Sequence, residues 1–197
     1  DALESSEYNS NTVIVFWSDH GWHLGEKRHW HKSTLWEEST RIPLIIAAPK
    51  LKPGVCDQPV SLLDLYPTLL DLCGISGNQQ FDGLSLLPQL RVPKTKRQPV
   101  VIEFRKRNAA VRSARWRYIR YSDDSEELYD HKTDSNEWEN LASKSKYKMV
   151  KQRLAKWLPK NWSEPALSKN KFEFDPNSYS WKNKKTGKMY FGSNLDN

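Results

Sequence analysis

The stretch that decides the fold is VIVFWSDHG, residues 13–21. Its first five residues are β-branched or aromatic, which is typical of a strand buried on both faces. The apolar run ends abruptly before Asp19, His20 and a glycine. In open α/β sheets, ligands bind just beyond the carboxyl ends of the strands, so these two polar side chains are the first candidates for a site. The pattern therefore predicts an α/β fold with a polar site at this strand end.

Asp19 and His20 have the chemistry of metal ligands. A carboxylate oxygen beside an imidazole nitrogen can hold a divalent cation, although Ca2+ prefers oxygen ligands. The alternative is purely structural, with Asp19 capping the next helix and His20 bonded to the backbone. Four of the chain's five histidines lie between positions 20 and 31, which is a chemical cluster rather than a packing pattern. Residues 21–40 are therefore expected to form a functional loop, with a helical turn near residues 33–38.

The composition is that of one domain, or of one and a fraction. The 197 residues are 37% hydrophobic, and nine Trp, eight Tyr and six Phe supply bulky core material. No run of 18 apolar residues occurs, so no membrane span is expected. No signal peptide is visible, and the chain is expected to begin in the middle of a longer protein. Cys56 and Cys73 have no metal-ligand spacing, and separate core thiols are favoured over one disulfide.

Two further segments complete the first part of the chain. Residues 42–48 are predicted to form a second buried strand. A helix is predicted to begin at the capping-box sequence SLLD, residues 61–64, and to end before Gly74. Pro67 inside this helix is expected to kink it or to mark its true start. Because both strands require neighbours on each face, an exposed sheet edge or apolar face is expected in this chain by itself.

The second part of the chain is predicted to be a small antiparallel sheet with a packed helix. A basic, proline-containing linker covers residues 91–99. After it come four short strand-like segments, with a hairpin turn at residues 123–125, and then a helix that ends at Pro159. The expected strands are 99–104, 109–112, 116–121 and 127–129, and the expected helix is 144–158.

Composition divides the chain into three parts: residues 1–92, residues 99–158 and a basic, aromatic-containing tail of residues 159–197. Residues 142–197 contain thirteen Lys or Arg and only four Asp or Glu, a net charge of +9. The whole chain carries +7, so the remainder is slightly acidic. A tail of this composition is expected either to wrap the domain or to stay mobile.

The polar and aromatic residues around the first strand end form three blocks: SDHGWHLGEK (18–27), WHK (30–32) and LWEESTRIPLI (35–45). Together they closely resemble the sulfatase family of the alkaline phosphatase superfamily, and the nearest branch is that of the iduronate-2-sulfatase-like enzymes. Residues 64–69 and 82–88 are similar to later segments of the same family. The resemblance implies the C-terminal part of an alkaline-phosphatase-like mixed sheet with flanking helices, followed by the small antiparallel subdomain.

The resemblance also implies roles for individual residues. Asp19 and His20 would be ligands of Ca2+. Lys32 would contact the sulfate group as a catalytic and substrate-binding residue, and a compact ammonium group is a good point-charge partner for a sulfate oxyanion. By their chemistry, His23, His29 and His31 could each orient the substrate or act as an acid for the leaving group, and each could simply line the loop. Of these, His23 is the catalytic candidate and His31 the substrate-binding candidate.

Two other charged residues of the loop have ordinary structural interpretations. Arg41 could bridge to Glu37, to Glu38 or to the active-site loop, and a structural ion pair is the favoured interpretation. Lys27 is expected to be merely solvated, as most lysines are. Neither residue is expected to take part in the reaction.

The catalytic nucleophile of the family is not found in this sequence. Sulfatases use a formylglycine made from the Cys or Ser of a Cys/Ser-x-Pro-x-Arg motif, and neither Cys56 nor Cys73 lies in such a motif. The resemblance therefore implies that a missing N-terminal half is a partner of this chain, and that the isolated chain is inactive. The implied reaction is the metal-dependent hydrolysis of a sulfate ester, with a sulfated carbohydrate as substrate. The implied location is secreted, periplasmic or lysosomal.

Two other functions are compatible with the sequence. The first is hydrolysis of phosphate esters by an enzyme of the same superfamily, because Asp-His-Gly alone is shared more widely. The second is a non-enzymatic remnant that binds anionic glycans through its tail. In that tail, lysines interleave with aromatic residues at positions 179–191. Nucleic acid is a less favoured partner, and a merely soluble, lysine-rich extension is the simplest interpretation of the tail.

Overall fold

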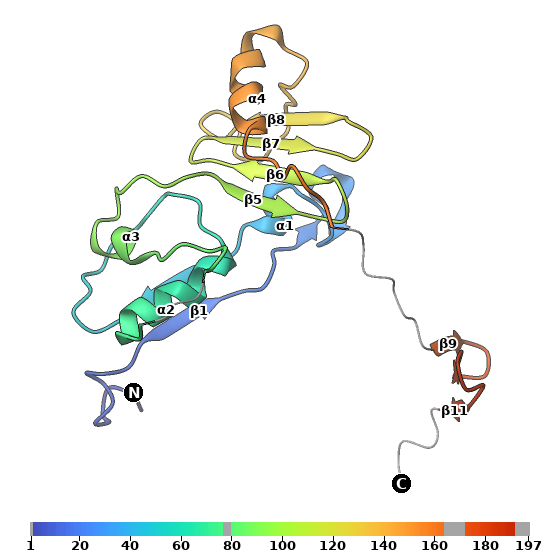
Figure 1. Ribbon diagram of the computed structural model, residues 1–197, viewed down its shortest axis with the longest axis horizontal. Coiled ribbons are helices and arrows are strands. Elements are labelled where there is room, and N and C mark those ends of the chain that lie inside the picture. Colours follow the sequence, from blue (N-terminus) through green and yellow to red (C-terminus); the bar gives the residue numbers. More distant parts are fainter. Residues whose placement is uncertain (1, 77–79, 164–171, 192–197) are drawn as a thin grey trace. The chain divides into compact units, whose positions relative to one another are not determined.

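The computed structural model describes residues 2–76, 80–163 and 172–191 (Figure 1). The chain separates into two compact units, Asp1–Ser163 and Glu164–Asn197, and each is described here by itself. Within the described ranges, no helix is long and apolar enough to cross a membrane. The first unit contains the sheets and helices that position the candidate site.

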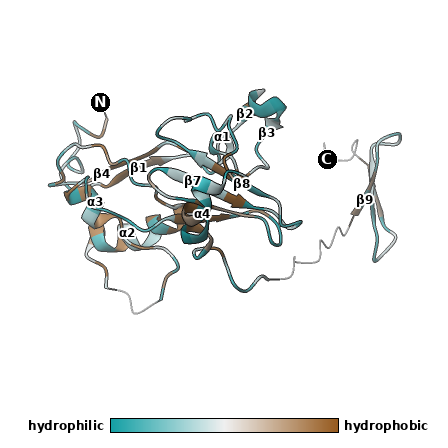
Figure 2. Cartoon of the chain, turned by 90° about the horizontal axis from the view of Figure 1, so that it is seen from above, coloured by the Kyte–Doolittle hydropathy of each residue, from teal (hydrophilic) through white to brown (hydrophobic). Residues whose placement is uncertain are grey.

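The decisive stretch forms β1 (Ile14–Trp17), which pairs with β4 (Leu44–Ala47) in an antiparallel, two-stranded ribbon. The expectation that both strands are buried on both faces is wrong for this chain. Phe16, Trp17 and Ile45 are 58%, 50% and 61% exposed. Both strands are apolar (Figure 2), but no other strand of the described residues pairs with them. The expected exposed apolar face is therefore present.

The loop between these two strands contains only short elements. They are β2 (His23–Leu24), the 3-10 turn η1 (Glu26–Arg28), β3 (Trp30–His31) and α1 (Glu37–Thr40). β2 and β3 pair as a hairpin around η1. The predicted helical turn is therefore present, but it begins at residue 37 instead of 33.

The helical part of the first unit begins at the predicted capping box. The side chain of Ser61 accepts a hydrogen bond from the backbone N–H of Leu63, and Asp64 Oδ2 accepts one from the N–H of Ser61 at 2.6 Å. The elements that follow are η2 (Leu62–Asp64), α2 (Leu65–Cys73) and α3 (Leu87–Arg91). Pro67 lies in the first turn of α2, where a missing N–H is tolerated, and Gly74 ends the helix with a φ of 66°.

The second part of the first unit is a four-stranded antiparallel sheet, as predicted. Its strands are β5 (Val100–Glu103), β6 (Ala109–Arg112), β7 (Trp116–Arg120) and β8 (Glu126–Asp130). They pair in chain order. The predicted helix follows as the turn η3 (Ser145–Tyr147) and α4 (Lys148–Ala155), as Figure 1 shows.

The two faces of this sheet have different coverings. One face packs against Leu154 of α4, and the other packs against Leu35, which lies just before α1. Both leucines are 2% exposed. The residues on the α4 face include Val111, Tyr118 and Leu128, and those on the Leu35 face include Ala110, Ile119 and Tyr129. The sheet therefore holds the loop that carries the predicted site residues.

Residues 172–191 of the tail form a sheet that the sequence did not predict. Its strands are β9 (Phe172–Asp175), β10 (Ser180–Asn183) and β11 (Met189–Phe191), with β10 in the middle and both pairings antiparallel. The expectation of a wrapping or mobile tail also covers residues 164–171 and 192–197, which lie outside the described residues.

Candidate active site

Asp19 and His20 lie just beyond β1, with His20 Nε2 3.5 Å from Asp19 Oδ2. His20 Nδ1 lies 2.8 Å from the carbonyl oxygen of Gly21 and must donate to it, because a carbonyl only accepts. In a neutral imidazole, Nε2 then carries the lone pair that faces the carboxylate. Two acceptors side by side suit a bound cation, and the Asp19 side chain is 80% exposed. The pair fits a metal chemically, but it supplies only two of the roughly six to eight ligands of Ca2+.

Gly21 sets the position of this strand end against α1. Its backbone N–H donates to the carbonyl oxygen of Ser39 at 2.9 Å. A Cβ atom at this position would lie 2.0 Å from the carbonyl oxygen of Glu38, far inside any real contact. Glycine is therefore required here by the close approach of two backbones, which a side chain would prevent.

Lys32 lines the same cavity as Asp19 and His20. This cavity is open and measures about 1180 Å³. Ser39 Oγ donates a hydrogen bond to the backbone carbonyl of Lys32, which ties this residue to α1. The structure thus brings the two predicted metal ligands and the predicted sulfate contact to one cavity, while their roles stay predictions.

Arg41 does not form the ion pair that was expected. Among the described residues, Glu37 pairs with Arg112 and Arg117 instead, and no ion pair of Arg41 is found. Arg41 is exposed and lines the same cavity as Lys32. Its guanidinium group is therefore a second positive charge available at this site.

The other predicted histidines have different surroundings. His23 is fully buried, its Nε2 lies 2.8 Å from Thr34 Oγ1, and burial lowers its pKa. His31 is exposed, and its ring is edge-on to Trp22 at a centroid distance of 5.3 Å. Trp22 also lies 6.0 Å from the His20 ring. Of these residues, only His20 lines the cavity.

A buried ion-pair network joins α1 to the four-stranded sheet. The Arg117 side chain is 1% exposed, and its Nε lies 2.6 Å from Glu137 Oε1 while its Nη2 contacts Glu37. Glu137 Oε2 accepts the backbone N–H of Glu37 at 2.9 Å, and Arg112 Nε lies 3.1 Å from Glu37 Oε2. Burial alone would raise the pKa of Glu37, but Arg117 and Arg112 lower it to about 2. The network therefore stays charged and fixes α1 to the sheet.

Glu37, His131 and Glu137 have the ligand types of a metal site, with ligand atoms within 4.8 Å of one another. However, Arg112 and Arg117 already contact these carboxylates. The guanidinium groups of Arg112 and of the buried Arg117 would repel a dication, and the carboxylate charges that they neutralise are no longer available to it. We therefore interpret this cluster as a structural ion-pair network.

Sequence analysis missed this network, although the strand pattern contained a signal. Along β7, the sequence WRYIR places Arg117 on the same face as Ile119, because side chains alternate. Ile119 is fully buried. A charged residue that shares a face with a buried isoleucine indicates a buried partner of opposite charge.

Lys27 is not the solvated residue that was expected. Its Nζ lies 3.1 Å from Tyr129 Oη, and 4.8 Å from the ring centre of Trp36. It also donates to the backbone carbonyl of Glu137. Burial lowers its pKa. Lys27 is therefore a structural link between the site loop and the second sheet, which sequence reasoning on a single lysine could not foresee.

Comparison with known families accounts for most of the first unit. Residues 25–164 match the family described as N-sulphoglucosamine sulphohydrolase, C-terminal. The chain belongs to the sulfatase family. The predicted α/β fold is confirmed by solved sulfatases of alkaline-phosphatase-like architecture, which match 77% of this chain with TM-scores of 0.66 and 0.68.

Individual relatives give the extent of this likeness. The chain is 42% identical over 162 residues to a sulfatase of Formosa agariphila, covering 81% of the chain and 32% of that protein. A solved structure in complex with its substrate D-glucosamine-2-N,6-O-disulfate is 30% identical, with a TM-score of 0.67 and coverages of 78% and 34%. The phosphonate monoester hydrolase of Silicibacter pomeroyi is 30% identical, with a TM-score of 0.69 and coverages of 79% and 35%. The chain thus spans about a third of the length of these relatives.

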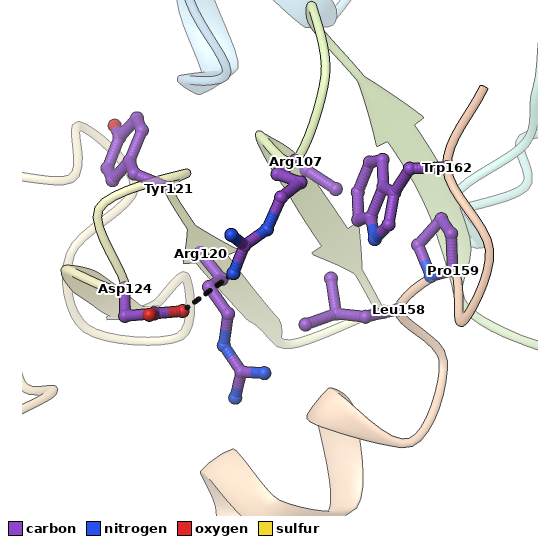
Figure 3. A pocket seen from close by; sticks show the side chains of 8 residues that line it. Arg107, Arg120, Tyr121, Asp124, Leu158, Pro159 and Trp162 are labelled. Atoms are coloured by element: carbon purple, nitrogen blue, oxygen red, sulfur yellow. Dashed lines mark hydrogen bonds and ion pairs between the residues drawn. The ribbon is translucent and has the colours of Figure 1, made fainter. Parts of the chain in front are cut away.

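A second, smaller cavity of this sulfatase-family chain contains none of the predicted site residues. It measures about 100 Å³, and Figure 3 shows Arg107, Arg120 and Trp162 among the side chains around it. Arg107 Nη2 lies 3.4 Å from Asp124 Oδ1, which partly neutralises its charge. The larger cavity beside Asp19 therefore remains the candidate active site.

Proposed function

We propose that this chain carries part of the active site of an enzyme that hydrolyses sulfate esters of carbohydrates, in the iduronate-2-sulfatase-like branch of the family. The observation that carries the proposal is that Asp19, His20 and Lys32 line one open cavity. A sulfate group needs cationic partners, and a metal-ligand pair beside a lysine supplies them. The similarity to a protein whose substrate is a disulfated glucosamine supports a sulfated sugar as the substrate class.

Each residue has a defined role in this proposal. Lys32 binds a sulfate oxygen through its ammonium group, and Arg41 offers a second contact from the same cavity. Asp19 and His20 would hold a divalent cation, with Ca2+ as the first candidate, and such an ion would supply Lewis-acid chemistry at the sulfate group. His31, which is exposed beside Trp22, orients the sugar.

His23 is removed from the reacting groups. Its ring is fully buried and bonded to Thr34, so it cannot reach a leaving group in the cavity. A general acid must come within hydrogen-bond reach of the atom it protonates. In the proposal, His23 stabilises the loop through its contact with Thr34 and takes no part in proton transfer.

The nucleophile is proposed to come from a segment that is not in this chain. Cys56 is a free thiol that lines the cavity, but the residues after it are Asp57-Gln58-Pro59 and do not fit Cys-x-Pro-x-Arg. A formylglycine on an N-terminal half would complete the site, and the chain alone would be inactive. A secreted, periplasmic or lysosomal location belongs to the same proposal and is supported by family resemblance alone.

A chimera tests the proposal. This chain would replace the matching third of the Formosa agariphila sulfatase, whose remainder would supply the nucleophile. We expect the chimera to release sulfate from D-glucosamine-2-N,6-O-disulfate and the chain alone to release none. Changing Asp19→Asn together with His20→Ala should remove both the activity and the bound calcium measured by atomic emission. A folded, calcium-loaded chimera without sulfatase activity would refute the proposal.

Hydrolysis of phosphonate or phosphate monoesters is a second candidate, favoured by one observation. The phosphonate monoester hydrolase of Silicibacter pomeroyi matches the chain as well in three dimensions as the sulfatases do. Sulfate and phosphonate esters present similar tetrahedral oxyanions to a lysine and a metal ion. Assay of the same chimera on matched 4-nitrophenyl sulfate and phenylphosphonate esters separates the candidates, because the preferred ester gives the higher kcat/KM.

A further inference from the structure

The sheet β9–β11 has one aromatic face. Along β9, Phe172 and Phe174 alternate with two acidic residues, so the phenyl rings share a face. In register, Phe174 is opposite Trp181 of β10, which is in turn opposite Tyr190 of β11. Cross-strand partners in a sheet lie on the same face. All three strands therefore contribute aromatic rings to one side of this small sheet.

These rings form a continuous and accessible platform. The ring centroids of Phe174 and Trp181 are 4.9 Å apart, and those of Phe172 and Tyr190 are 5.7 Å apart. Tyr179, in the turn before β10, lies 5.9 Å from Trp181. Phe172, Phe174 and Tyr190 are each more than two-fifths exposed. The rings thus contact one another in tilted and T-shaped pairs, while a large part of the surface of Phe172, Phe174 and Tyr190 is exposed.

The charges of the sheet are separated by face. Alternation places Glu173 and Asp175 on the opposite side, where Glu173 is in register with Lys182. On the aromatic side, Lys188 Nζ lies 5.2 Å from the ring centre of Tyr190. The aromatic face therefore has a positive charge beside it and no carboxylate from the strands.

Two more lysines stand at the end of this platform. Lys184 and Lys185 are exposed in the turn between β10 and β11. Asn183 Oδ1 accepts the backbone N–H groups of Lys185 and Thr186, which holds the turn in shape. The lysines are therefore presented by an ordered turn.

We propose that this aromatic face binds a sulfated polysaccharide through residues that are not among those of the candidate active site. Pyranose rings have apolar C–H faces that pack on aromatic side chains, and the sulfate groups require cations such as Lys184, Lys185 and Lys188. The face combines both features. The choice of a sulfated sugar polymer over another anion rests on the proposed function. The sheet lies beyond residues 25–164, the part that matches the family model, and belongs to the second compact unit of the chain.

Binding of the whole chain to dextran sulfate, measured by isothermal titration calorimetry, tests the proposal. Unsulfated dextran of equal length and a single-stranded oligonucleotide of equal charge are the comparison ligands. We expect dextran sulfate to bind more tightly than either. Removing two rings with Phe174→Ala and Trp181→Ala should weaken binding at least about tenfold, and Lys184→Gln with Lys185→Gln at least about threefold.

A matched control separates loss of the platform from loss of the sheet. Phe191 lies on the opposite face of β11, since it is in register with Ser180, and Phe191→Ala should change affinity less than about twofold. Far-UV circular dichroism checks that each variant keeps its secondary structure. Equal loss in Phe191→Ala, equal binding of the oligonucleotide, or full binding by the double ring variant would each overturn the proposal. Because no hydrolysis is measured, loss of sulfatase activity in the chimera with polymer binding intact would refute only the proposed function.

Discussion

The backbone of Lys32 is held by a hydrogen bond, whereas its side chain is exposed. Its backbone carbonyl accepts a hydrogen bond from Ser39 Oγ, while its side chain is exposed at the cavity. The fixed backbone places Lys32 at the cavity, and in the proposed function its ammonium group contacts the sulfate. Gly21 contributes differently, by allowing two backbones to approach.

Replacing Lys32 by Ala should impair the reaction without affecting folding. In the chimera, we expect Lys32→Ala to lower kcat/KM for a sulfate ester by about a hundredfold or more, the usual effect of removing one preorganised charge contact. The unfolding midpoint should barely change, because the side chain is exposed. Steady-state kinetics and thermal unfolding of the same preparations measure both effects.

The control for Lys32 is Lys52, which is exposed and lies outside the cavity. Lys52→Ala should change kcat/KM less than about twofold. Lys27 is unsuitable as a control, since it contacts Tyr129 and Trp36 and its loss should lower the unfolding midpoint. If Lys32→Ala and Lys52→Ala had equal effects, the assignment of Lys32 to the sulfate would be wrong.

Gly21→Ala should destabilise the chain through a steric clash. The added Cβ would lie 2.0 Å from the carbonyl oxygen of Glu38, so α1 or the strand end must move. We expect a loss of about 1–3 kcal/mol in the free energy of unfolding, measured by urea titration. Gly74→Ala is the comparison, because it meets no atom within 4 Å and costs only the strain of a positive φ, about 1–2 kcal/mol. Gly21→Ala should also lower the activity of the chimera, because the clash would displace the strand end that carries Asp19 and His20. Gly74→Ala should leave the activity unchanged, because Gly74 is outside the site.

α1 is too short to be stable by itself, so its position depends on the sheet beneath it. This helix has four residues and no side-chain cap. Glu137 accepts the N–H of Glu37 in the place of a cap, and Arg117 donates to the carbonyl of Leu35 just before the helix at 2.8 Å. The element that ties the backbone of Lys32 is therefore held by residues about a hundred positions later in the chain.

Glu37→Gln should destabilise the first unit strongly. The substitution keeps the shape but leaves the buried Arg117 with one carboxylate fewer, and breaking a buried ion pair in this way costs about 3–5 kcal/mol. Urea titration of the chain measures the loss. Glu139→Gln provides the contrast, because its ion pair with Lys144 is exposed and should contribute less than about 1 kcal/mol. Similar losses in the free energy of unfolding from both variants would show that the buried network stabilises the chain no more than an exposed ion pair does.

The same network predicts how stability depends on pH. The pKa of Glu37 falls from its ordinary 4.5 to about 2 on folding, because Arg117 and Arg112 outweigh the effect of burial. Its stabilising contribution is therefore complete above about pH 4.5 and is lost as the pH falls toward 2. The pKa of Glu137 is lowered as well, so part of the acid sensitivity should remain in Glu37→Gln. Unfolding midpoints between about pH 6 and pH 3 should fall less steeply for that variant than for the wild type.

At the scale of the whole molecule, the ribbon β1–β4 stands out because it is apolar and exposed. Its most exposed side chains, those of Phe16, Trp17 and Ile45, are each at least half exposed. Exposed, contiguous apolar side chains on a strand pair are typical of a surface that another sheet or chain covers. The four-stranded sheet, in contrast, has a buried core on both faces.

The isolated chain should therefore associate. We expect light scattering after size exclusion to show a mass that rises with concentration, because burying the ribbon removes apolar surface from water. Phe16→Ser with Ile45→Ser should shift the chain toward the monomer, whereas Met149→Ser, an exposed residue on α4, should not. A concentration-independent monomer for the wild type would contradict this expectation.

The sequence alone was sufficient for features that depend on neighbours along the chain. Strand alternation predicted β5–β8, the Ser61–Asp64 pattern predicted a helix start, and Gly74 predicted its end. The residue types after β1 were enough to single out Asp19 and His20, because a carboxylate and an imidazole at a strand end are typical metal ligands. Lys32 was singled out by the family resemblance. Features of this kind can be predicted because they depend only on residues that are close together in the sequence.

Only the tertiary structure decided which of these residues can act. The structure buries His23, joins Lys27 to Tyr129 and leaves Arg41 exposed at the cavity. The ion pairs of Arg117 with Glu37 and Glu137 join positions 80 and 20 residues apart. No local pattern specifies such partners, because the free energy of a charge depends on its burial and on what lies opposite to it in space. These are properties that the chain acquires only when its sheets pack.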